Sequence, residues 1–286
     1  MGATSDTHID DLRFEDLVDL EPHGPDTYVG VAPRYTWARL YGGQVVAQAL
    51  RAAQLSVDDD LVVHSLHAYF IRGGTSAEPV RFEVDRVRNG RSFATRQVAA
   101  RQSNGAILSL QASFQRPETE VDVQTRRPPP ELPPPEAGDD TGWGRLMDRR
   151  PVGSTFAATT TWLRLDGPAG RDPRIDECGL AFLSDGVPTG AVRAAHPVQV
   201  PRSEIRSTFM GASLDHAIYF HRPVSPHQWL VAEMHCHGLS GGRGLAIGNL
   251  YDAEGVHAIT IVQETLLRVR RGEDDRGIDG LGGKEG

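Results

Sequence analysis

The sequence lacks the marks of a secreted, disulfide-bonded or membrane-spanning protein. Its only two cysteines, Cys178 and Cys236, give no disulfide framework, and reduced thiols are the ordinary state in the cytosol. No apolar run reaches the roughly 18 residues that a membrane helix needs. The first twelve residues are polar and acidic, without the apolar centre of a signal peptide. We therefore expect a cytoplasmic protein with no membrane partner.

A surplus of positive charge is also missing. The formal net charge is −8 at pH 7 and no basic stripe offsets it, so we expect no nucleic-acid partner. What is present is ordinary for a globular protein: 286 residues, of which 39% are hydrophobic and 24% charged. That length suffices for one large domain or two medium-sized ones, each with its own core.

The two halves of the chain resemble each other. Residues 64–72 align without gaps with residues 214–222, an offset of 150 in the numbering. Similarity over so long a distance indicates a duplicated domain rather than a solenoid repeat. In the first copy Ser65 occupies the position that Asp215 has in the second, so only the second copy has the carboxylate.

Each half is predicted to form a short strand, a buried helix and four antiparallel strands. The helix at 42–53 has apolar residues at helical spacing on one face, and Asn89-Gly90 is typical of a hairpin turn. In the first half the strands are expected at 27–32, 61–71, 79–88, 92–102 and 106–115. In the second half a strand at 156–164, a helix at 173–185 and a loop at 186–212 precede strands at 214–220, 229–237, 243–251 and 256–269.

A proline-rich stretch separates the halves. Its two Pro-Pro-Pro runs can continue neither a helix nor a strand, so they predict an extended linker. We expect an N-terminal domain at 14–116, the linker at 117–141, a C-terminal domain at 142–270 and a flexible tail at 271–286. The tail is charged and rich in glycine, which is typical of disorder.

Two stretches carry candidate chemistry. Asp215 lies in a predicted strand among Leu214, Ile218 and Phe220, where Asp is unusual and costs free energy unless it gains a partner. A carboxylate in such a place can hold a water molecule and accept its proton. The glycines that open the helix at 42–53 leave backbone N–H groups approachable, which suits polarisation of a carbonyl oxygen. A turn that simply needs glycine geometry explains them equally well.

Four segments, in order, resemble the bacterial acyl-CoA thioesterase II (TesB-like) family. They are residues 40–50, residues 63–70, residues 213–216 with 220–223, and residues 242–244 with 262–264. The resemblance extends over roughly residues 14 to 270. It implies an α+β double hotdog, in which each of two tandem repeats curls an antiparallel sheet around a central helix.

The resemblance also implies hydrolysis of fatty acyl-CoA thioesters by a water held between an Asp, a Ser or Thr, and a Gln, without metal or cofactor. Asp215 and Gln263 match the Asp and the Gln of the family. The hydroxyl position departs from the pattern: the Thr falls on His237 and a nearby Ser on Gly238, which leaves Ser240 as the expected third member.

Five further residues are expected to contact the acyl-CoA substrate: Gly42, Gly43, Arg72, Arg222 and His237. The two arginines end equivalent strands and suit CoA phosphates. Pairing with acidic residues is the structural alternative for both of them.

Two other readings of the second half are weaker. Residues 238–242 fit the G-x-S-x-G motif of a nucleophile elbow, but a predicted strand rather than a helix follows them. His235 and His237 would share one strand face and could bind a metal, yet no third ligand accompanies them, so no metal is expected.

The sequence thus predicts an acyl-CoA thioesterase, with two alternatives. An enoyl-CoA hydratase of the same fold needs an Asp–His pair, but Asp215 and His216 are strand neighbours and should point to opposite faces. A non-catalytic acyl-CoA-binding protein would bind the ester and release no thiol. Because sheet edges and faces of this fold commonly seek partners, a homo-oligomer of two or more chains is expected.

Overall fold

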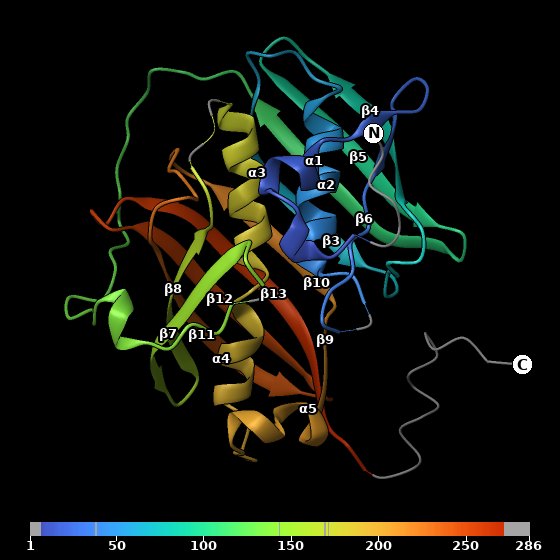
Figure 1. The fold of residues 1–286 in the computed structure, drawn as a ribbon. Helices are drawn as coiled ribbons and strands as arrows, with labels where there is room; N and C mark the ends of the chain where they lie inside the picture. Colours follow the sequence, from blue (N-terminus) through green and yellow to red (C-terminus); the bar gives the residue numbers. More distant parts are fainter. Residues whose placement is uncertain (1–6, 38, 143, 169, 171, 272–286) are drawn as a thin grey trace, which may run out of the picture.

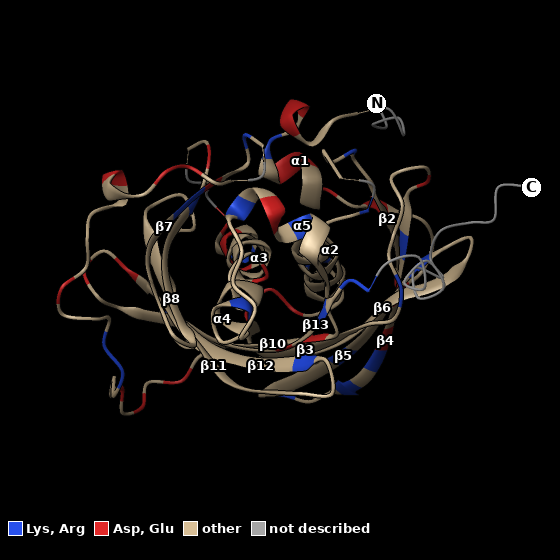
Figure 2. Ribbon diagram, turned by 90° about the horizontal axis from the view of Figure 1, so that it is seen from below, with Lys and Arg blue, Asp and Glu red and all other residues tan. Residues whose placement is uncertain are grey.

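The computed structural model describes residues 7–37, 39–142, 144–168, 170 and 172–271. Strands from both halves form one thirteen-stranded antiparallel sheet in this part of the chain. The sheet curls around two helices, α2 and α3, which lie side by side inside it (Figures 1 and 2). The predicted double hotdog is confirmed.

The first half runs through η1 (Ile9–Asp11), α1 (Phe14–Val18), β1 (Glu21–Pro22), β2 (Thr27–Gly30), α2 (Gly42–Gln54), β3 (Val62–Phe70), β4 (Val80–Asn89), β5 (Phe93–Gln102) and β6 (Gly105–Gln115). The linker contains η2 (Pro135–Ala137). The second half runs through β7 (Met147–Thr155), β8 (Ala158–Leu165), α3 (Pro173–Ser184), α4 (Pro188–Ala194), η3 (Arg202–Glu204), α5 (Ile205–Thr208), β9 (Phe209–Ser213), β10 (Asp215–Phe220), β11 (Leu230–Ser240), β12 (Arg243–Asp252) and β13 (His257–Val269).

The two central helices run in opposite directions. At the start of α2 the Tyr41 hydroxyl donates to the Phe182 carbonyl near the end of α3 (2.8 Å). At the other end, Gln54 Nε2 donates to the carbonyl of Arg174 in the first turn of α3 (3.1 Å). Alanines and glycines along both helices permit this close approach, and α2 is buried almost all round. The N-terminus of each helix therefore meets the C-terminus of the other.

The halves join through strands β3 and β10. Asp215 lies opposite Tyr69 in this antiparallel pair, and Tyr219 lies opposite Ser65. The repeat offset of 150 converts each of these pairs into the other, so the seam has an approximate two-fold axis like an isologous dimer interface. Only one of the two equivalent positions carries a carboxylate, because Ser65 replaces Asp215 in the first half.

Most predicted elements agree with the structure to within a few residues, but the segment expected as a loop at 186–212 does not. It contains α4, which begins at Pro188, and α5, and most of β9. Proline suits the first position of a helix because its missing N–H would have no partner there. Strand β7, which pairs with β8, also lay outside the predicted strands.

The linker follows the surface of the second half (Figure 1). Gln124 donates to the Gly255 carbonyl (2.8 Å) and accepts from the His257 amide (3.0 Å), and Trp162 Nε1 donates to the Pro133 carbonyl (2.8 Å). The expected tail at 271–286 lies outside the described residues except for its first position. In the part of the chain that is described, no helix has the length and apolar character to cross a membrane.

Candidate active site

A β-bulge places Asp215 at the seam between the halves. Ser213 is opposite Thr265 on β13, and Ala217 is opposite Val262. Three residues therefore lie between these pairs on the β9–β10 side but only two on β13. The extra residue falls at Leu214 and Asp215, which both face Glu264. Bulges of this kind re-aim a side chain and occur often next to active sites.

The Asp215 carboxylate has two different neighbours. Its Oδ1 accepts from the backbone N–H of Glu264 (2.6 Å), and its Oδ2 lies 3.1 Å from Nε2 of His67 on β3. Its side chain remains 22% exposed. The bulge thus holds one carboxylate oxygen by a charge-assisted hydrogen bond and leaves the other beside a histidine from the opposite repeat.

His67 connects this carboxylate to a cavity on the outer face of the sheet. Its ring lies 4.9 Å from that of Tyr69, the residue opposite Asp215. A cavity of about 240 Å³ adjoins both rings, and it is lined by His67, Tyr69, Gln97, Ser109, Leu110 and Gln111.

Gln263 lies on the inner face, which is the face toward the helices. Its side chain is fully buried, its Oε1 lies 2.6 Å from His216 Nδ1, and its Nε2 donates to Ser213 (3.0 Å) and to Thr265 (3.2 Å). The structure therefore does not bring the Asp215 and Gln263 side chains into contact. They are linked through the backbone, because the N–H that holds Asp215 belongs to the residue after Gln263.

The adjacent residues Asp215 and His216 point to opposite faces, as predicted. His216 is fully buried, and its Nε2 lies 2.7 Å from the hydroxyl of Ser184 at the end of α3. Burial lowers the pKa of His216 to about 4, although the hydrogen bond with Gln263 opposes this shift. The ring is therefore neutral at pH 7.

A second carboxylate, Asp185, lies in the break between α3 and α4. Its Oδ2 accepts from the Gly43 N–H at the start of α2 (2.9 Å), and its Oδ1 accepts from the Ser213 hydroxyl (3.0 Å). Burial raises the pKa of Asp185 to about 7, and the bonds from Ser213 and Gly43 limit the rise. One polar chain thus connects the N-terminus of α2 with Gln263.

The two glycines that open α2 are required by close approach. A Cβ at position 42 would lie 2.7 Å from Asp185 Oδ2 and 2.9 Å from the ring of Phe70. A Cβ at position 43 would overlap the carbonyl oxygen of Phe182. Contact with the end of α3 explains Gly43, and contact with the Asp185 side chain and with Phe70 of β3 explains Gly42. Contact of either glycine with substrate remains a prediction.

Removing the Asp185 carboxylate should change how stability depends on pH. Between about pH 4 and 6.5 the folded protein keeps a proton on Asp185 that the unfolded chain has lost, so this group lowers stability as pH rises. His216 acts in the opposite direction, because there the unfolded chain binds the extra proton. In Asp185→Asn we expect the free energy of unfolding to rise more steeply over this range than in the parent. Urea unfolding at several pH values measures it, and parallel curves for the two proteins would contradict the assignment.

Ser240 does not join this group. It is exposed at the end of β11, opposite Arg243, which in turn lies opposite Leu266. Gln263 is instead level with Ala246 and Cys236. Ser240 is therefore displaced from Gln263 by three residues along the sheet, roughly 10 Å, and by two strands across it. The structure therefore does not bring Ser240 to Asp215 or Gln263, and its role as the third member stays a prediction.

The other predicted contacts lie apart from these groups. His237 is exposed in a bulge of β11. Arg72 donates to the Asn104 carbonyl at the β5–β6 hairpin. Arg222 pairs with Asp122 of the linker, which is the structural alternative considered for it. Their contact with CoA remains a prediction.

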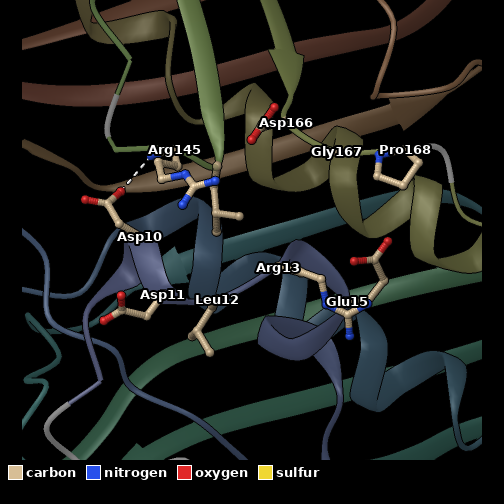
Figure 3. Close-up of a pocket in the computed structure, with 10 residues that line it drawn as sticks. Asp10, Asp11, Leu12, Arg13, Glu15, Arg145, Asp166, Gly167 and Pro168 are labelled. Carbon is tan, nitrogen blue, oxygen red and sulfur yellow. Dashed lines mark hydrogen bonds between the residues drawn. The ribbon is translucent and has the colours of Figure 1, made fainter.

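Two further features of the structure bear on ligand binding. No group of three His, Cys, Asp or Glu side chains converges as metal ligands among the described residues. A cavity of about 210 Å³ lies between the first helices and the ends of β7 and β8 (Figure 3). Its lining is Asp10, Asp11, Leu12, Arg13, Glu15, Arg145, Leu146, Asp166, Gly167 and Pro168, and it includes none of the expected site residues.

Sequence reasoning missed three residues of the site. His67 lies within the repeated stretch, but its proximity to Asp215 depends on the pairing of β3 with β10. Asp185 was predicted only as the end of a helix, and Ser213 only as part of the strand motif. A buried position for Asp185 could have been inferred from the apolar residues that precede it on α3.

Comparisons with known proteins agree with this architecture. Models of the acyl-CoA thioesterase N-terminal and C-terminal domains match residues 31–115 and 124–267. Acyl-coenzyme A thioesterase 8 of Mus musculus is 33% identical over 292 residues, which cover 89% of this chain and 88% of that protein. Acyl-CoA thioesterase 2 of Haemophilus influenzae is 29% identical over 282 residues, which cover 90% of this chain and 95% of that protein.

Solved structures give the same picture. The crystal structure of acyl-CoA thioesterase II TesB2 from Mycobacterium marinum superposes with a TM-score of 0.77 at 33% identity. The match covers 91% of this chain and 99% of that one. Since the two domain models together match most of its length, this chain belongs to the acyl-CoA thioesterase family.

Proposed function

We propose that this protein hydrolyses acyl-CoA thioesters to a fatty acid and CoA, with Asp215 as the general base that activates water. The observation that carries the proposal is the geometry of the bulge. One Asp215 oxygen is fixed by the Glu264 N–H, while the other lies at the partly exposed seam and is able to accept a proton. Family membership supports a thioester substrate.

Gln263 enters the proposal as the residue that sets the position of this base. Its amide is bonded at both ends on the inner face, which fixes the backbone of β13 at this point. The next N–H along the strand is the one that holds Asp215. A shift of Gln263 would therefore move the carboxylate relative to the bound ester. Ser240 has no part in the proposal.

A thiol-release assay across a panel of acyl-CoA chain lengths tests the proposed function. We expect one free thiol for each ester consumed, and equal amounts of fatty acid. Saturable binding of acyl-CoA with no thiol over hours would instead indicate the non-catalytic binding protein. The same panel reports which acyl length the site prefers.

One observation favours the hydratase as a second candidate. His216 cannot assist Asp215, but His67 lies 3.1 Å from it, so an Asp–His pair does exist at the seam. Crotonyl-CoA separates the two reactions. Hydration removes the enoyl absorbance without releasing thiol, whereas hydrolysis releases thiol.

Location in the cytoplasm and assembly into a homo-oligomer remain predictions from the sequence. The outer face near the seam exposes two large rings, Tyr69 (56% exposed) and Tyr219 (48%), which a second copy could cover. Light scattering in solution measures the number of chains in the assembly.

A further inference from the structure

Consecutive residues at the break between α3 and α4 reach both ends of the Gln263 amide. Ser184 contacts His216, which contacts Gln263 Oε1. Asp185 contacts Ser213, which contacts Gln263 Nε2.

Asp185 determines the direction of each hydrogen bond in the series that runs from Asp185 through Ser213, Gln263 and His216 to Ser184. An ionised Asp185 has no proton, so the Ser213 hydroxyl must donate to it. The Ser213 oxygen then accepts from Gln263 Nε2, which leaves the amide oxygen facing His216. An amide oxygen only accepts, so His216 must carry its proton on Nδ1.

The contact between His216 and Ser184, at the other end of this series of hydrogen bonds, agrees with that direction. His216 is neutral because it is buried, so a ring protonated at Nδ1 has a lone pair at Nε2. The Ser184 hydroxyl lies 2.7 Å from that nitrogen and 2.9 Å from the Ala181 carbonyl, and in this arrangement it donates to the ring. While Asp185 is ionised, a reversed amide would place the Ser213 and Gln263 oxygens face to face with no proton between them, because the Ser213 proton is already donated to the carboxylate.

We infer that Ser184 and Asp185 are positioning residues that fix which end of the Gln263 amide faces His216, and through Gln263 the place of the catalytic carboxylate. The expected effect on activity rests on the proposed function. The expected protonation state of the His216 ring is independent of it. Asp185 also accepts a hydrogen bond from the Gly43 N–H at the N-terminus of α2. The break between α3 and α4 therefore links the packing of the two central helices to the seam between β3 and β10.

The His216 ring gives a test that needs no turnover. Nitrogen-15 NMR of the full chain at about pH 8, above the pKa of Asp185, should show His216 neutral and protonated at Nδ1. In Asp185→Asn the side-chain amide must present its NH₂ either to the Gly43 N–H or to Ser213. We therefore expect the ring to shift toward the Nε2-protonated form. A parent ring already protonated at Nε2 would overturn the inference.

Kinetics distinguish positioning from a structural role. We expect Asp185→Asn and Ser213→Ala each to lower kcat about 10- to 100-fold while KM stays within about threefold. Ser213→Thr, which keeps the hydroxyl, should recover most of the parent kcat. The double variant should be no slower than either single one, because both changes break the same connection.

Controls keep the outcomes separate. Ser207→Ala removes a hydroxyl of α5 whose bond within the described residues is to the Glu204 carbonyl, and it should leave kcat unchanged. Multiplying losses in the double variant, or equal kcat in Ser213→Ala and the parent, would overturn the inference even if Asp185→Asn fails to fold. If the parent itself releases no thiol from any acyl-CoA, the proposed function fails, and the His216 signal still decides the positioning.

Discussion

Asp215→Asn is expected to lower kcat/KM for thioester hydrolysis at least about 100-fold, the range usual for loss of a general base. An asparagine has almost the same shape as aspartate, and its oxygen can still accept from the Glu264 N–H, so the bulge should persist. It cannot accept a proton from water at neutral pH, and it loses the charge that faces His67. Thiol release under subsaturating substrate measures the change.

A matched substitution separates the loss of a base from the loss of a negative charge. Asp85→Asn changes an exposed Asp of strand β4 and should leave kcat/KM within about twofold of the parent. Both variants should unfold at the same urea concentration as the parent to within experimental error. Unchanged turnover in Asp215→Asn, with the Asp85 variant also unchanged, would remove Asp215 from the mechanism.

Gly43→Ala should destabilise the fold by about 2–3 kcal/mol, the cost typical of overpacking a closely packed contact. The added methyl group would overlap the Phe182 carbonyl oxygen and lie 2.6 Å from the ring of Tyr41. The Phe182 carbonyl belongs to the backbone of α3 and cannot rotate away as a flexible side chain can. The ends of α2 and α3 must therefore separate. That separation also lengthens the bond from Gly43 to Asp185, so activity should fall with stability. Urea unfolding gives the free energy of unfolding.

A second helical glycine provides the comparison. At Gly190 in α4 the nearest atoms to an added Cβ belong to Thr159, at 3.8 Å, which is ordinary contact. Gly190→Ala should therefore be neutral or stabilise the protein by about 0.4–1 kcal/mol, since alanine restricts the unfolded chain. Equal effects at the two glycines would show that the helix ends are not in the predicted contact.

The fold could be predicted because its signals are local and repeated. Alternating apolar residues and hairpin turns placed strand β3 within 61–71, and an apolar helical face placed α2 at 42–53. The position of the Asp215 side chain could not be predicted in the same way. It depends on a bulge, and a bulge is a property of the pairing between two strands about fifty residues apart.

The candidate site was predicted in part for the same reason. Asp215 was singled out because a carboxylate is unexpected in a strand, whatever that strand pairs with. Ser240 was chosen by its distance along the chain from a motif, and the register of β11 places it away from Gln263. Asp185 gave no such local signal, since an Asp at a helix end is common and only packing against α2 buries it.

The two-fold character of the seam does not extend to its chemistry. Each half contributes an equivalent strand to the seam, yet only the second half has an acid at the bulge position, where the first has Ser65. His67 of the first half supplies the partner of that acid. The site therefore needs both repeats, although only one of them carries the proposed base.

The central claim is that Asp215 activates water and does not itself attack the thioester carbonyl. A single turnover with enzyme in excess, in water enriched in heavy oxygen, tests it by mass spectrometry of both the fatty acid and the peptide that contains Asp215. Direct attack by water predicts one heavy oxygen atom in the fatty acid and none in the peptide. An unlabelled fatty acid with a labelled Asp215 would show that the carboxylate forms an anhydride, and it would contradict the account.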